Sequence, residues 1–202
     1  MPLGRYLAST EKRVRDRAIR SLAAFVLMRA QEGGLSMSPA ELSKLWEGLF
    51  YCFWMSDKPL VQQQLAQELS ELVLMVAGID TRSDEAQVAS LRHALAALDF
   101  YQGFWHTMQA EWLGVDKFRV DKYYLLMRRF LQAGCQLLLV YGCDALLVER
   151  YVHIMRGTDG PLSSNNVHVP DSITYHICDA FLAELDAAVA AHAEASPAVP
   201  TI

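Results

Sequence analysis

The sequence predicts an all-α protein, and three observations support this fold class. Apolar residues recur at intervals of three and four positions, no stretch alternates between apolar and polar residues as a half-buried strand does, and glycine or proline separates the periodic segments. We expect seven helices joined mostly by short connections, which favours antiparallel hairpins packed in a HEAT-like stack. A plain helical bundle is the alternative, because the sequence shows no fixed repeat period.

The N-terminal half contains three predicted helices. The first spans about residues 11–31 and is stopped by Gly33-Gly34. Ser38-Pro39-Ala40-Glu41 is a capping box with proline at the first helical position, so it opens the second helix. Asp57-Lys58-Pro59 breaks this helix and starts the third, which Gly78 ends.

The C-terminal half contains four predicted helices and one long loop. The loop covers residues 157–169, which include two glycines, one proline and the run Ser163-Ser164-Asn165-Asn166. Asp116 is expected to cap the fifth helix. The four helices span about residues 84–112, 116–141, 144–155 and 170–192. Residues 1–195 are therefore predicted to form one helical domain, and residues 196–202 the start of a linker or tail.

Composition limits the class of protein. The 202 residues are 52% hydrophobic and 20% charged, which is typical of a globular domain rather than a disordered or fibrous chain. No apolar run approaches the ~18–20 residues that a bilayer requires, and no N-terminal signal peptide is expected. The four cysteines form no C-x-x-C pair, which favours free thiols in an intracellular, reducing compartment.

Charge is unevenly distributed along the chain. The formal net charge is −5, yet residues 1–20 carry six basic side chains against two acidic ones. A second basic group lies between residues 115 and 130, whereas residues 171–202 contain no lysine or arginine and five acids. Arginine presents several donors that suit phosphate oxygens, so the basic groups are candidate RNA contacts. A solvated helix face with intrahelical ion pairs remains an equal alternative.

One segment is apolar on every side of its predicted helix. Residues 45–55, Leu-Trp-Glu-Gly-Leu-Phe-Tyr-Cys-Phe-Trp-Met, are uninterruptedly apolar from Leu49 onward. A helix of this kind lies centrally in a core or presents one face to a partner, and the core is favoured. An exposed aromatic residue at its end would instead indicate a protein-binding site.

The sequence contains none of the common catalytic or metal-binding motifs. It has no phosphate-binding glycine loop, no G-x-S-x-G turn and no H-E-x-x-H pair, and its six histidines form no ligand cluster with the cysteines. An enzyme is therefore not expected, and no catalytic, cofactor or metal residue is assigned. From the residues alone, the prediction is a helical binding domain.

Four blocks of sequence carry a family resemblance. The run Leu-Trp-Glu-Gly-Leu-Phe-Tyr-Cys-Phe-Trp-Met-Ser-Asp-Lys-Pro at 45–59 strongly resembles the signature of the eukaryotic ribosomal RNA processing protein 1 family. Three further blocks resemble the family in the same order: 15–19 resembles its first helix, 104–108 with 111–112 and then 115–124 its central part, and 173–185 its closing helix. The resemblance covers nearly the whole chain.

The resemblance implies a non-catalytic ribosome biogenesis factor of the nucleus and nucleolus. Such a protein would act as a helical scaffold in pre-rRNA processing and in assembly of pre-ribosomal particles, mainly those of the large subunit. Its partners would be pre-ribosomal assembly factors and pre-rRNA, with no cofactor, membrane or small-molecule substrate. A purely protein-binding adaptor without RNA contact is the alternative. The candidate RNA or partner contacts are Arg13, Arg15, Arg17, Arg20, Trp54, Lys58, Lys117, Arg119 and Lys122.

Overall fold

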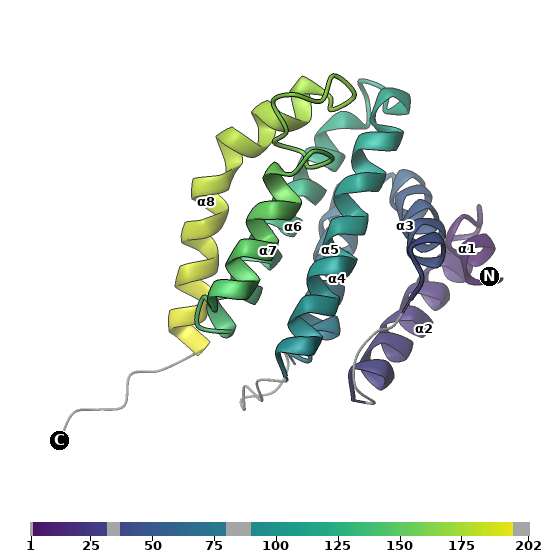
Figure 1. The fold of residues 1–202 in the computed structure, drawn as a ribbon. Helices are drawn as coiled ribbons and strands as arrows, with labels where there is room; N and C mark the ends of the chain where they lie inside the picture. Colours follow the sequence, from purple (N-terminus) through teal and green to yellow (C-terminus); the bar gives the residue numbers. More distant parts are fainter. Residues whose placement is uncertain (1, 32–36, 80–89, 196–202) are drawn as a thin grey trace.

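The computed structural model describes residues 2–31, 37–79 and 90–195 of the chain (Figure 1). All regular structure in these ranges is helical, which confirms the predicted fold class. The elements are α1 (Pro2–Leu7), α2 (Lys12–Gln31), α3 (Pro39–Trp54), α4 (Pro59–Val76), α5 (Leu91–Glu111), the 3₁₀ turn η1 (Trp112–Gly114), α6 (Val120–Val140), α7 (Ala145–Arg156) and α8 (Asp171–Ala195).

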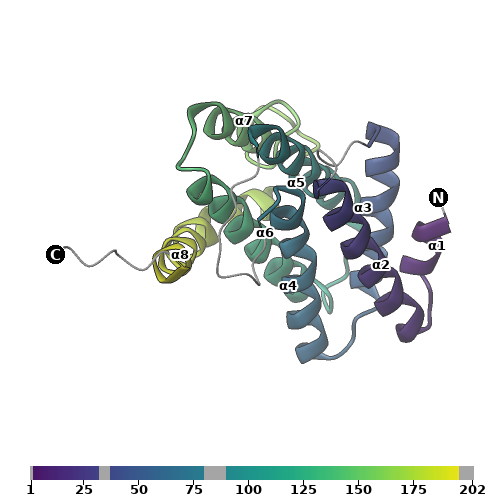
Figure 2. The same ribbon diagram turned by 90° about the horizontal axis from the view of Figure 1, so that it is seen from below.

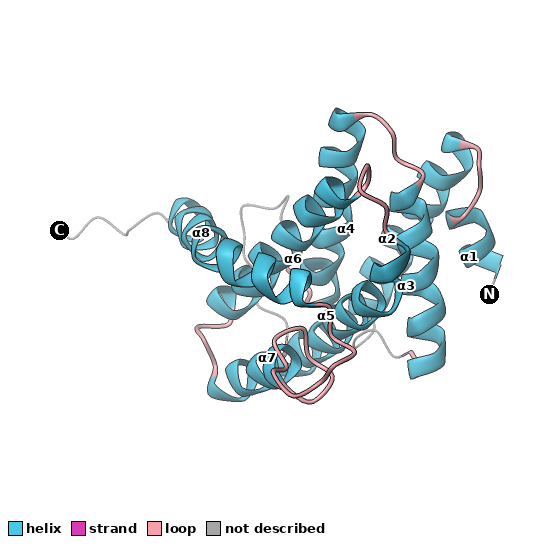
Figure 3. Ribbon diagram, turned by 90° about the horizontal axis from the view of Figure 1, so that it is seen from above, coloured by secondary structure: helices cyan, strands magenta, loops and turns pink. Residues whose placement is uncertain are grey.

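The helices form two layers, which Figures 2 and 3 show from opposite sides. Each helix packs mainly against the next but one along the chain. Contacts therefore run from α1 through α3 and α5 to α7 in one layer, and from α2 through α4 and α6 to α8 in the other. Contacts between the layers are most extensive for α4 with α5 and for α1 with α2. The arrangement is a stack of helices, as predicted, because every inner helix buries apolar residues against neighbours on more than one side.

Local signals set several of the helix boundaries as predicted. The backbone N–H of Glu41 donates to Ser38 Oγ at 3.3 Å, and the backbone N–H of Ser38 donates to Glu41 Oε2 at 3.0 Å, which completes the capping box at α3. Pro59 is the first residue of α4. Asp144 caps α7 by accepting a hydrogen bond from the backbone N–H of Leu146 at 2.9 Å.

Three boundaries differ from the prediction. The short helix α1 was not expected, because six residues are too few to show a helical period. The prediction that Asp116 caps the fifth helix is wrong, since α6 begins at Val120 and Asp116 instead accepts the backbone N–H of Phe118 in the preceding turn. Helix α8 continues three residues beyond His192. The predicted helix start at Asp84 and the predicted linker at 196–202 lie outside the described residues.

The core is built around aromatic side chains from α3, α5 and α6. The rings of Phe104 and Phe130 stack with centroids 3.7 Å apart, and Trp46 packs edge-on against both. Trp46 also donates from its indole Nε1 to the carbonyl oxygen of Phe100 at 2.9 Å, which satisfies its one buried polar atom. The apolar segment at 45–55 therefore lies mainly in the core, as favoured. In the described part of the chain, no helix is long and apolar enough to cross a membrane.

Candidate nucleic-acid interface

The C-terminal end of α3 is the point where three helices meet. A helix end exposes unpaired carbonyl oxygens and a partial negative charge, so cations are favoured there. Lys122, from the first turn of α6, donates from Nζ to the carbonyl oxygens of Trp54 at 2.7 Å and Ser56 at 2.8 Å. Its ammonium also lies 5.6 Å from the centre of the Phe53 ring. Lys122 thus joins α6 to the end of α3.

Arg15 binds the same helix end from the other side. Its guanidinium donates to the carbonyl oxygen of Met55 at 3.2 Å, and to those of Ser9 at 2.8 Å and Thr10 at 3.0 Å. Arg15 is 8% exposed and Lys122 is 6% exposed. These two candidate contact residues therefore bind backbone carbonyls in the interior, and little of either side chain is accessible to a partner.

Next to these buried cations lies a second group, which we call the aromatic–basic end and define as Trp54, Lys58, Lys117, Phe118 and Arg119. Lys58, Lys117 and Phe118 are exposed, and Trp54 and Arg119 are half-buried. The guanidinium of Arg119 lies 4.6 Å from the centre of the Trp54 ring, and the Asp116 carboxylate accepts a hydrogen bond from it. This contact is a cation–π pair at the edge of the core. Trp54 is consequently half-buried, with one face covered by Arg119.

Phe118 is the feature of this end that the sequence analysis missed. Its side chain is 84% exposed, although a phenylalanine normally buries most of its surface. The backbone N–H of Phe118 donates to Asp116 Oδ1 at 2.9 Å, which fixes the turn that presents the ring. The ammonium of Lys117 lies 5.0 Å from the ring centre. An aromatic residue between two basic ones, Lys-Phe-Arg, is the sequence signal that could have identified it.

The first basic group lies along α2. Arg13, Arg17 and Arg20 are exposed and follow the spacing i, i+4 and i+7, which places them on one face of the helix. No ion pair joins any of them to another described residue. The carboxylate of Asp16 pairs with Lys12, which lies one turn before it, at 2.6 Å. The four-residue spacing from Asp16 to Arg20 would allow a pair with the following turn as well. The contact of Arg15 with Met55 brings the start of this row to the same end of α3.

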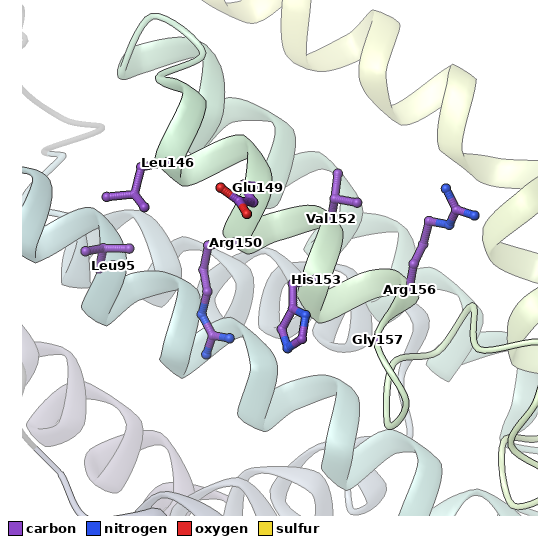
Figure 4. Close-up of a pocket in the computed structure, with 8 residues that line it drawn as sticks. All are labelled: Leu95, Leu146, Glu149, Arg150, Val152, His153, Arg156 and Gly157. Carbon is purple, nitrogen blue, oxygen red and sulfur yellow. The ribbon is translucent and has the colours of Figure 1, made fainter.

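A shallow hollow of about 590 Å³ lies between α5 and α7, and Figure 4 shows the residues that line it. The guanidinium of Arg150 points toward α5, where it donates to Asp99 Oδ1 at 2.8 Å and to Gln102 Oε1 at 2.7 Å. His153 points the same way (Figure 4). Among residues 2–31, 37–79 and 90–195, no group of three or more histidine, cysteine, aspartate or glutamate side chains is placed to hold a metal ion. The hollow assembles no recognisable set of catalytic groups.

Comparison with known proteins agrees with the resemblance in the sequence. A family model described as "Nucleolar protein, Nop52" matches residues 1–201. The chain is 34% identical over 183 residues to ribosomal RNA processing protein 1 homolog A of Homo sapiens, an alignment covering 91% of this chain and 36% of that protein. It is 37% identical over 180 residues to homolog B of Mus musculus, covering 89% of this chain and 22% of that protein.

A more distant relative matches the same extent of chain. The chain is 29% identical over 184 residues to the ribosomal RNA processing protein 1 homolog of Drosophila melanogaster, covering 90% of this chain and 24% of that protein. The chain thus spans about a third or less of the length of these relatives. Because the family model and the sequence identity both extend over nearly all of it, the chain belongs to the Nop52 family of nucleolar proteins, together with the ribosomal RNA processing protein 1 homologues.

Proposed function

We propose that this chain is a non-catalytic ribosome biogenesis factor that works in the nucleolus as a helical scaffold. It would take part in pre-rRNA processing and in assembly of pre-ribosomal particles, mainly those of the large subunit. Two findings support the proposal: the family is described as nucleolar, and the relatives are named for ribosomal RNA processing. Its partners would be other assembly factors and pre-rRNA.

The observation that carries the RNA contact is the exposed ring of Phe118 between Lys117 and Arg119. Proteins bind single-stranded RNA by stacking unpaired bases on aromatic rings while neighbouring cations contact the phosphates. A ring that is 84% exposed is open to a base. Lys117 and Lys58 are exposed and supply charge for the phosphates of adjacent nucleotides. This surface therefore favours an unpaired segment of pre-rRNA over a duplex.

The arginine row on α2 extends the proposed contact. Arg13, Arg17 and Arg20 span about two turns, or roughly 10 Å, which is long enough to reach two successive phosphates. Each phosphate contact releases condensed counterions, so affinity should fall steeply with salt. Because the chain as a whole carries a net charge of −5, such binding depends on these local groups rather than on total charge.

The experiment is RNA binding by the purified chain, measured across a salt series with single-stranded pre-rRNA fragments and with duplexes of the same sequence. We expect single strands to bind more tightly, Phe118→Ala to weaken them by about 1–3 kcal/mol, and a triple Arg13→Ala, Arg17→Ala, Arg20→Ala variant to lower the salt slope. Val167→Ala is the control, because Val167 is also an exposed apolar residue, at 93%, and lies in the loop between α7 and α8. Equal binding of duplexes and single strands, or no response to Phe118→Ala, would count against base stacking.

A purely protein-binding adaptor is the second candidate. Leu113 is 92% exposed in the same connection as Phe118, so this end also offers two accessible apolar side chains. Such a surface can serve a protein partner. This candidate predicts that the purified chain binds no RNA, while Phe118→Ala still reduces its association with pre-ribosomal particles.

A further inference from the structure

The outer face of α8 carries a row of apolar side chains that no described residue covers. The opposite side of the helix is buried against α6, through Ile173, Ile177 and others. Tyr175, Leu182 and Val189 are 67%, 69% and 47% exposed. Their seven-residue spacing places them on one side of the helix, in a row roughly 21 Å long. Three large apolar side chains in line are unusual for a surface that contacts only water.

Helix α8 is the last member of its layer, and Figures 1 and 3 show it at the edge of the stack. It runs parallel to α6. The ring of His176 stacks on Tyr124 near the start of both helices, and Arg128 pairs with Glu184 at 2.6 Å further along. The inner face of α8 is therefore packed against α6 along most of the helix. The outer row is equivalent to the face that each preceding helix of the layer buries against the next one.

The charge of this face is uniformly negative. Asp171, Asp179 and Asp186 are exposed and alternate with the apolar residues along the same side of α8. Helix α8 contains no lysine or arginine, and no described basic side chain pairs with these three carboxylates. Glu184 differs from them, since it is buried and already paired with Arg128. The exposed carboxylates are thus free to attract a cationic partner.

We propose that the outer face of α8 binds a basic amphipathic helix of a partner protein. The partner helix would present apolar residues at seven-residue spacing to Tyr175, Leu182 and Val189, in the manner of helix pairing along a heptad seam. Lysine or arginine on the flanks of the partner helix would contact Asp179 and Asp186. The aliphatic stems of these basic side chains would cover the edges of the apolar row. This proposal does not depend on the RNA contact proposed above.

The charge pattern disfavours the other occupants. A second copy of α8 on this face would bring carboxylates against carboxylates, and RNA phosphates would meet the same repulsion. A cationic helix is the occupant that satisfies both the apolar spacing and the negative charge. Self-association and RNA binding at this face are therefore distinct results in the test below.

The test uses the full chain and two synthetic 21-residue helical peptides. Both carry leucine at heptad positions, and they differ only in having lysine or glutamate on the flanks. We expect the lysine peptide to bind at least about ten-fold more tightly, measured by fluorescence anisotropy, and Leu182→Asp to weaken it at least about ten-fold. A double Asp179→Lys, Asp186→Lys variant should reverse the preference between the peptides. Val167→Asp, at an apolar position outside α8 that is even more exposed than Leu182, is the control and should change nothing.

Two exposed cysteines give an independent readout. Cys178 lies on α8 beside Tyr175 and Leu182, while Cys143 lies in the turn between α6 and α7. Bound lysine peptide should slow alkylation of Cys178 and leave that of Cys143 unchanged. Equal affinity for both peptides, or unchanged binding by Leu182→Asp with its helix content intact, would overturn the proposal. It would also be overturned if Leu182→Asp abolished a dimer in sedimentation or abolished binding of a pre-rRNA fragment.

Discussion

The ammonium of Lys122 lies 2.7 Å from the carbonyl oxygen of Trp54, and this contact joins the two layers of the stack at one end of α3. Helices α3 and α6 belong to different layers, and they also meet in the core, where the ring of Tyr123 stacks on Phe50 and its hydroxyl donates to the Phe50 carbonyl oxygen at 3.1 Å. Lys122 reaches Ser56 as well, and Arg15 reaches Met55 between those two residues. The segment from Trp54 to Ser56 is therefore a structural junction, which explains why basic residues far apart in the sequence converge on it.

Replacing Lys122 by methionine should destabilise the protein although the aliphatic stem keeps nearly the same length. The carbonyl of Ser56 retains a hydrogen bond from Gln62 Nε2 at 2.9 Å, but the partly buried carbonyl of Trp54 loses its donor. We expect the free energy of unfolding to fall by about 1–3 kcal/mol in urea denaturation. Lys117→Met, at an exposed position in the same region, should change it by less than about 0.5 kcal/mol. Equal stability of the two variants would show that the junction contributes nothing.

The junction should also make stability depend on pH. Burial lowers the pKa of Lys122 to about 8, and the nearby charge of Arg119 acts in the same direction. Between this value and the usual lysine pKa of about 10.4, the unfolded chain binds more protons than the folded one, so stability contributed by this group rises with pH. The difference in free energy of unfolding between the natural protein and Lys122→Met should therefore grow from pH 8 to pH 10, by at most about 1.4 kcal/mol per pH unit. A difference that shrinks over this range would contradict the sign.

Close packing of α3 against α5 depends on Gly103. A Cβ atom there would lie 2.5 Å from Trp46 Cδ1, and the indole cannot easily retreat because its Nε1 is bound to the carbonyl of Phe100. Overpacking of this kind costs about 1–3 kcal/mol, which exceeds the roughly 1 kcal/mol that alanine gains over glycine in a helix. Gly103→Ala should lower the urea midpoint. Gly114→Ala, where nothing lies within 4 Å of the added atom, should leave it unchanged.

Much of the fold could be predicted from local sequence, because helix signals are short-range. The Ser38 capping box and the Pro59 start are set by residues within one turn, and both boundaries are confirmed. Asp116 shows the limit of this reasoning. Its side chain accepts a hydrogen bond from the backbone N–H of Phe118, which lies in a turn, and not from an N–H of the first turn of α6. The sequence alone does not distinguish an aspartate that caps a turn from one that caps a helix.

The candidate site was harder to predict than the fold, because exposure depends on distant residues. Arg15 and Lys122 look like surface cations in the sequence, but both are buried at the end of α3. Arg15 binds Met55, 40 residues further along the chain, and Lys122 binds Ser56, 66 residues back. The reverse holds for Phe118. Phenylalanine is usually a core residue, but here the turn that begins at Asp116 holds its side chain in solvent. Arg15 is buried and Arg17 is exposed, because residues two positions apart on a helix lie about 200° apart around its axis and cannot both point inward.

A pair of phenylalanines separates the proposed binding role of Phe118 from a folding role. Phe104 is 2% exposed and stacked on Phe130, whereas Phe118 is 84% exposed. Phe104→Ala should lower the free energy of unfolding by about 3–5 kcal/mol, because it leaves a cavity in the aromatic core. Phe118→Ala should lie within about 0.5 kcal/mol of the natural protein while still weakening RNA binding. Loss of stability in Phe118→Ala, measured by urea denaturation, would mean that the ring packs against the fold and is not available to stack on a base.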